Sequence, residues 1–174
     1  MATNRKLGKA TDIRLAMLKT QVTDLLWHEK IETTLTRAKE IKAITDSLIA
    51  LAVKESGNYD EVEVKVSKAK LDEKGNKVTE LAKSKNGKEY LKVVREETTE
   101  KRKKDKPSKL NARRKIMRNV NKVKDSEGNE IDIPTKLFDE LAPKYKNNNG
   151  GYTRIIREGV RRGDAAELVI LELI

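Results

Sequence analysis

The stretch that decides the fold is the C-terminal segment NGGYTRIIR (149–157), EGVRRGD (158–164) and AAELVILELI (165–174). Glycines precede its first apolar run and separate that run from the second, and turns need the positive φ angles that glycine adopts. Both runs are rich in β-branched residues and too short for independent helices, which predicts a β-hairpin with arginines on its first strand and at its tip. Only Glu172 interrupts the final strand, so we expect most of that strand's surface to be buried.

The composition narrows the function. Of the 174 residues, 39% are charged and 3% are aromatic, so we expect a small core. The net charge is +11, so the partner is expected to be a polyanion such as nucleic acid. The positive charge is spread, with a net +3 in residues 1–56 and +4 in each of 57–106 and 107–174. The chain has no cysteine, no secretion signal and no membrane-spanning run, which predicts a cytoplasmic protein without a membrane partner.

Two amphipathic helices are predicted in the first third of the chain. Leu15, Leu18, Val22 and Leu25 recur at spacings of three and four, which indicates one buried helical face after an extended basic N-terminal arm at 1–10. The arm can equally be a frayed terminus. A second helix is predicted from about residue 34 to 55, and the short β-branched segment 31–34 is expected to complete the sheet of the hairpin. The predicted class is therefore α+β.

Residues 58–106 have a different pattern. Val62, Val64 and Val66 alternate with polar residues, and turn signals at 72–76 and at Asn86-Gly87 separate two further runs at 77–83 and 90–94. This predicts a three-stranded antiparallel β-meander followed by a charged linker at 100–106. Its apolar face can dock a protein or pack on RNA, and the sequence leaves both alternatives open.

Seven blocks of the chain, in order, resemble the bacterial large-subunit ribosomal proteins of the L-seventeen family. The blocks are RKLG (5–8), RLAML (14–18), IETT (31–34), RAKE (37–40), KLFDELAP (136–143), GGYTRI (150–155) and RRGDA (161–165). The resemblance covers about 1–55 and 107–174. Residues 56–106 depart from the family's pattern, which predicts an α/β body at 11–57 and 107–174 with an inserted β-rich subdomain at 58–106.

The resemblance implies a small mixed sheet packed with helices, and a non-catalytic constituent of the 50S subunit. It also implies binding to 23S ribosomal RNA near the exit of the peptide tunnel, beside neighbouring ribosomal proteins. No cofactor, metal ion or small-molecule substrate is expected. An enzyme is the competing hypothesis, because Glu29, Glu32 or Glu40 can supply a carboxylate, but the chain has one histidine, no cysteine and no metal-ligand spacing.

The basic residues expected to contact RNA belong to the arm, the two helices above, a third helix predicted after Ser108, and the hairpin. Lysine and arginine neutralise phosphates and release counterions, and arginine adds planar contacts with several donors. The sparse aromatic residues argue against stacking on single-stranded bases, so recognition of backbone and shape is expected. The expected RNA-binding residues are Arg5, Lys6, Lys9, Arg14, Arg37, Lys39, Arg113, Arg114, Lys115, Arg118, Arg154, Arg157, Arg161 and Arg162.

Overall fold

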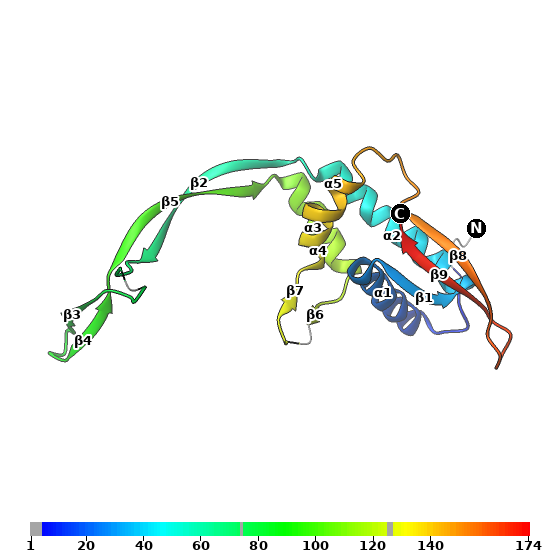
Figure 1. Cartoon of the computed structure of the whole chain (residues 1–174), viewed down its shortest axis with the longest axis horizontal. Coiled ribbons are helices and arrows are strands. Elements are labelled where there is room, and N and C mark those ends of the chain that lie inside the picture. Colours follow the sequence, from blue (N-terminus) through cyan, green and yellow to red (C-terminus); the bar gives the residue numbers. More distant parts are fainter. Residues whose placement is uncertain (1–4, 74, 125–126) are drawn as a thin grey trace. The chain divides into compact units, whose positions relative to one another are not determined.

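The computed structural model describes residues 5–73, 75–124 and 127–174 (Figure 1). The chain divides into two compact units. Met1–Asn58 and Asp105–Ile174 form the main unit, and Tyr59–Lys104 form the ribbon unit. Helices and small antiparallel sheets make up the fold, which confirms the predicted α+β class.

The main unit contains a three-stranded sheet in the order β1 (Lys30–Thr34), β9 (Glu167–Leu173) and β8 (Thr153–Val160). The predicted hairpin is confirmed, but the prediction of a mixed sheet is wrong, because both strand pairs are antiparallel. The antiparallel register places Ile31 opposite Leu171 and Thr33 opposite Val169, so the residues that face the core on the two strands are direct neighbours. In the final strand Val169, Leu171 and Leu173 are buried, the residues between them are partly buried, and Glu167 is exposed, so one face of the strand is covered more completely than the other.

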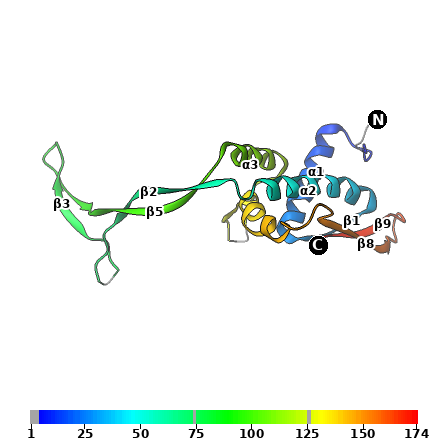
Figure 2. The same cartoon turned by 90° about the horizontal axis from the view of Figure 1, so that it is seen from above.

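Two helices cover one face of this sheet: α1 (Thr11–His28) and α2 (Leu35–Glu55) (Figure 2). The predicted second helix is confirmed, and its buried side chains include Ile41 and Ile49. The predicted burial of Leu15 is wrong, since its side chain is 55% exposed. In α1 the buried residues begin at Leu18, so the apolar stripe extends one turn beyond the surface that covers it.

The rest of the main unit closes the core. It comprises α3 (Pro107–Asn119), the two-stranded β6 (Val123–Lys124) and β7 (Glu130–Ile131), and a helical run of α4 (Ile133–Lys136), the π-helix η1 (Leu137–Leu141) and α5 (Ala142–Lys144). The helical run continues through Pro143, which has no N–H for an ordinary helical bond. The backbone accommodates this by widening one turn, where Ala142 donates to the carbonyl of Leu137.

The ribbon unit differs from its predicted pairing. β2 (Tyr59–Ala69) is bonded to β5 (Arg95–Asp105), and β3 (Thr79–Lys83) is bonded to β4 (Glu89–Val93), so two two-stranded sheets replace the predicted three-stranded meander. Residues 100–105 are part of a strand rather than a charged linker.

Opposite charges across the long ribbon explain why it pairs without an apolar core. Lys68 forms an ion pair with Glu100, and Lys70 Nζ lies 3.0 Å from Glu96 Oε1. These cross-strand pairs supplement the backbone ladder in a sheet of only two strands.

Candidate nucleic-acid interface

A groove of about 600 Å³ brings together three segments of the main unit that are distant in sequence. Arg5 comes from the N-terminal segment, Arg37 from the first turn of α2, and Arg161 from the turn between β8 and β9. We call this the arginine groove, and its other lining residues are Leu7, Thr34, Leu35, Thr36, Asp164, Ala166 and Glu167. Three arginines and the carboxylate residues Asp164 and Glu167 therefore line one hollow, and guanidinium groups are the donors that bind carboxylate and phosphate groups most strongly.

The N-terminus of α2 adds donors to the same groove. Thr34 precedes the helix in an extended conformation, and its side chain makes no capping hydrogen bond. The first turn of α2 contains no acidic residue. The groove is therefore lined by the first helical residues, whose backbone N–H groups have no helical acceptor and carry the positive end of the helix dipole. This combination can hold a phosphate.

Two of the groove arginines are oriented by acidic partners. Arg5 Nη1 lies 2.6 Å from Oε1 of Glu40, a nearly buried carboxylate on α2, while half of the Arg5 side chain remains exposed. Arg161 donates from Nε and Nη2 to the two oxygens of Asp164, at 2.9 and 2.6 Å. The hydrogen bond from Arg161, with a second from the Ala166 amide, lowers the pKa of Asp164 to about 2. Arg37 forms no ion pair with another described residue.

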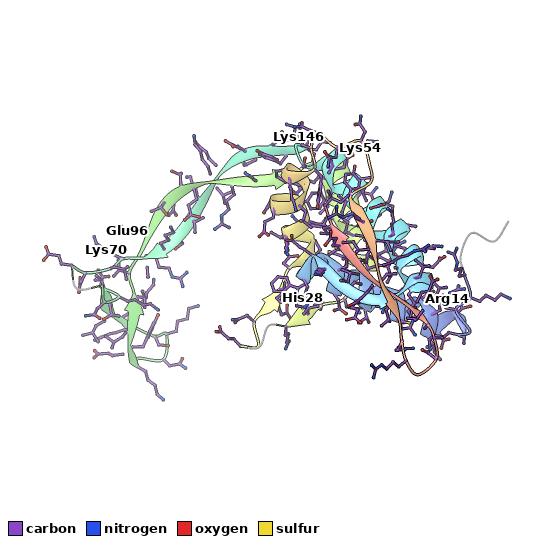
Figure 3. The ribbon with its side chains drawn as sticks, turned by 45° about the vertical axis from the view of Figure 1, so that its right-hand side comes forward. Arg14, His28, Lys54, Lys70, Glu96 and Lys146 are labelled. Atoms are coloured by element: carbon purple, nitrogen blue, oxygen red, sulfur yellow. The ribbon has the colours of Figure 1, made fainter. Side chains whose placement is uncertain are left out.

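Other predicted residues of the arm and nearby helices lie around these segments. The described part of the arm, residues 5–10, is not extended as predicted; it turns back through Leu7 and Gly8, both with positive φ, and the Lys9 amide donates to the Lys6 carbonyl. Arg14 Nη1 donates to the Arg5 carbonyl at 3.4 Å (Figure 3). Residues 1–4 lie outside the described part of the chain. Lys6, Lys9 and Lys39 are exposed.

The basic cluster on α3 is a separate surface. Arg114, Lys115 and Arg118 are exposed, but Arg113 is half-buried and engaged within the main unit. Its Nε donates to Asp105 Oδ2 at 3.2 Å, its Nη1 donates to Thr135 Oγ1 at 3.0 Å, and its guanidinium lies over the ring of Phe138. These contacts connect α3 to α4 and η1, so Arg113 has a structural role that its position in a basic run did not indicate.

The remaining predicted arginines lie on the hairpin. Arg154 donates to Glu172 Oε1 on the neighbouring strand, at 3.0 Å from Nε. Arg157 lines a small hollow of about 210 Å³ with Val160 and Leu168, and Arg162 is exposed beside the groove arginine Arg161. Of the fourteen predicted residues, only Arg5, Arg37 and Arg161 line the arginine groove.

Sequence reasoning missed the donors at the start of α2. The sequence did contain a signal for them, because the second helix was predicted to begin at the threonine-rich segment ending at Thr34. A helix N-terminus between two basic segments is a site for anions. Within the ranges that the structure describes, no cluster of three or more metal-ligating side chains occurs, and none of the described helices is long and apolar enough to cross a membrane.

Comparison with known proteins decides the family. The model of the family described as "Ribosomal protein L17" matches residues 17–174. The chain belongs to this family. It is 58% identical to the large ribosomal subunit protein bL17 of Acetivibrio thermocellus and 53% identical to that of Ruminiclostridium cellulolyticum, with all of both chains covered in each case. It is 45% identical to the bL17 protein of Lachnospira eligens, again over the full length of both.

Membership of the L17 family confirms the resemblance that the seven sequence blocks indicated. Ribosomal protein L17 is a structural rather than catalytic component, so the prediction that the chain is not an enzyme is confirmed as well. The alignments with the proteins of Acetivibrio thermocellus and Ruminiclostridium cellulolyticum run through residues 59–104, so the ribbon unit is matched in them rather than skipped.

Proposed function

We propose that this L17-family protein is a structural constituent of the large ribosomal subunit in the cytoplasm, where it binds 23S ribosomal RNA near the peptide exit tunnel. The observation that carries the proposal is the arginine groove. Guanidinium groups from three segments and the free N–H groups of α2 converge on one hollow. Such a constellation suits the phosphates of a folded RNA.

The aromatic residues of the main unit support recognition of RNA through its backbone and shape. Of the four aromatic rings of the main unit, those of Phe138, Tyr145 and Tyr152 are buried, each residue no more than 5% exposed, so they are not available to stack on bases. The fourth, Trp27, is partly buried, and Lys136 Nζ lies 5.2 Å from its ring centroid. Proteins that read single-stranded RNA usually present exposed aromatic rings for this purpose. The arginines of the groove are instead placed to neutralise phosphates.

The other exposed basic residues extend the proposed RNA surface. We assign RNA contacts to the arm, to Arg14 and Lys39, to Arg114, Lys115 and Arg118 on α3, and to Arg154, Arg157 and Arg162 on the hairpin. Their exposure leaves them accessible, with Arg14 half-buried. For Arg113 the proposed RNA contact is limited to the guanidinium N–H groups that do not donate to Asp105 or Thr135. Neighbouring ribosomal proteins are the proposed protein partners.

We also propose that 58–106 is an insertion into a body formed by 11–57 and 107–174. The compactness of Tyr59–Lys104 as a unit of its own supports this division. If the proposal holds, deletion of 59–104 with a short glycine-serine bridge leaves a body that still enters large subunits. Failure of a folded deletion variant to enter subunits would contradict it.

The proposed function is tested by sedimentation and crosslinking of the full-length chain. An epitope-tagged copy expressed in a clostridial host should co-sediment with large subunits and remain there at moderate salt. Ultraviolet crosslinking of those subunits, followed by primer extension on 23S and 5S RNA, should give stops in 23S RNA close to the tunnel exit. A tagged chain that stays in the light fractions, or stops confined to 5S RNA, would refute the proposal.

A further inference from the structure

The hairpin of β3 and β4 in the ribbon unit exposes leucines on one face. Leu81 pairs with Leu91 across the two strands, and their exposed fractions are 76% and 66%. Thr79 and Val93 form the next pair on this face. The opposite face carries Glu80 and Lys92 among its residues and is more polar. We call the first surface the leucine face.

The charged residues around the leucine face are mostly positive, and the positive ones are all lysines. Residues 77–94 contain five lysines against two glutamates and no arginine. Lys83 Nζ lies 3.3 Å from Glu89 Oε1, so one of the two glutamates is already neutralised at the edge of the leucine face. Lys85 and Lys88 lie in the exposed turn beyond that pair. An apolar centre with a positively charged border is complementary to an apolar surface with an acidic border.

We propose that the leucine face docks on a protein whose surface has exposed apolar side chains bordered by aspartate or glutamate. The hairpin differs from the arginine groove in chemistry. The groove presents arginines and backbone N–H groups to anions, whereas the leucine face presents two methyl-rich side chains that neither donate hydrogen bonds nor stack on bases. Cross-strand leucines at this exposure gain most from burial against another apolar surface.

Tyr90 provides a matched comparison on the same strand. It lies on the opposite face, next to Leu91 in sequence, and its exposed fraction is 50%. Its ring is the one feature of the described hairpin that suits a base of RNA. If RNA is the occupant, contact is expected on the Tyr90 side; if an acidic protein is the occupant, contact is expected on the Leu81 side.

The experiment uses photocrosslinking in assembled large subunits and therefore rests on the proposed function. The full-length chain carries p-benzoylphenylalanine in place of Leu81, Tyr90 or Gly163, and each version is first shown to co-sediment with subunits. The Leu81 probe should give a protein adduct at least tenfold more often than the Tyr90 probe. Mass spectrometry should place the adduct in a peptide that combines apolar residues with Asp or Glu, and Leu91→Ser should reduce its yield at least tenfold.

Three outcomes would overturn the docking proposal: equal yields from the two faces, adducts mainly to RNA or to a second copy of this chain, or no adduct from Leu81. The hairpin variants alter exposed side chains only, so loss of the main unit's fold does not account for such a result. The Gly163 probe reports on the proposed function separately, because it lies beside Arg162 without replacing it and should give RNA adducts. Absence of those adducts contradicts RNA binding, while the docking proposal is judged by Leu81 against Tyr90.

Discussion

Removal of two positive charges from the arginine groove should weaken the salt dependence of RNA binding by a calculable amount. We choose the double variant Arg37→Gln and Arg161→Gln. Arg37 forms no ion pair with another described residue, and the partner of Arg161, Asp164, is half exposed, so neither change leaves a buried charge unpaired. Arg5 is kept because its partner Glu40 is nearly buried.

The expected magnitude follows from counterion release. Each phosphate contact contributes about 0.7 to 0.9 to the slope of log affinity against log salt, so loss of two contacts should reduce the slope by about 1.4 to 1.8. Between about 50 and 200 mM salt, the drop in affinity should then be about 7- to 12-fold smaller for the variant than for the native chain. Filter binding or fluorescence anisotropy with a 23S RNA fragment measures both slopes.

Lys54→Gln with Lys146→Gln is the matched control, since it also removes two charges from the total of +11. Both lysines are exposed and lie far from Arg14 in Figure 3. Lys54 follows Arg37 along α2 by about 26 Å at 1.5 Å per residue. The control should retain the native slope to within about 0.3. Equal slope changes in the two variants would mean that net charge, and not the groove, governs binding, and would refute the reasoning.

Three further predictions concern the same main unit. Thr34→Asp should raise the free energy of unfolding by about 0.3 to 1 kcal/mol in urea titrations, because the new carboxylate caps α2. It should also lower the affinity for RNA, because it places a negative charge at the proposed anion site. An increase, or a decrease, of stability and RNA affinity together would contradict this prediction. Leu171→Ala, at a fully buried position of the central strand, should cost about 2 to 5 kcal/mol by the same titration. The carboxyl of Asp164 should titrate near pH 2 by NMR, and at a higher pH when Arg161→Gln removes the largest cause of the lowered pKa. Its contribution to stability is complete above about pH 3.8 and lost as the pH falls through 2.

The helices and strands with periodic apolar residues were predictable, because the spacing of those residues shows which kind of element would place them on one buried face. The helix at Leu35–Glu55 and the hairpin around residues 161–166 both followed from spacing and turn residues. Leu15 shows the limit of this reasoning. Its spacing matches the buried stripe, but the length of surface that covers α1 depends on packing between distant segments, which periodicity does not report.

The pairing in the ribbon unit was not predictable from apolar pattern. A meander is the simplest arrangement of three successive strands with turns between them, but it requires one continuous apolar face. In β5 the segment Arg95–Asp105 contains no aliphatic residue, and it was therefore interpreted in part as a linker. Two of its acidic residues instead form ion pairs with the other side of the ribbon: Glu100 with Lys68 on β2, and Glu96 with Lys70 just after β2.

The candidate site was predictable as a set of residue types but not as a place. Nothing in the sequence indicated that Arg5, Arg37 and Arg161 share one hollow while Arg113 is engaged with Asp105. Convergence of this kind depends on tertiary contacts between the arm, α2 and the hairpin turn. The family resemblance led to the proposed function. Only the fold distinguishes the basic residues that line the arginine groove from those, such as Arg113, that bond within the main unit.

The acidic partners of the groove arginines are compatible with the proposed RNA binding, because each leaves about half of the arginine side chain exposed. A guanidinium has five N–H donors, and Arg161 uses two of its groups on Asp164 while about half of its side chain remains exposed. The bidentate contact fixes the planar group before RNA arrives, so less side-chain entropy is lost on binding. Arg37 has no ion-pair partner among the described residues, so the proposed contact with phosphate should cost it more side-chain entropy than the contact of Arg161.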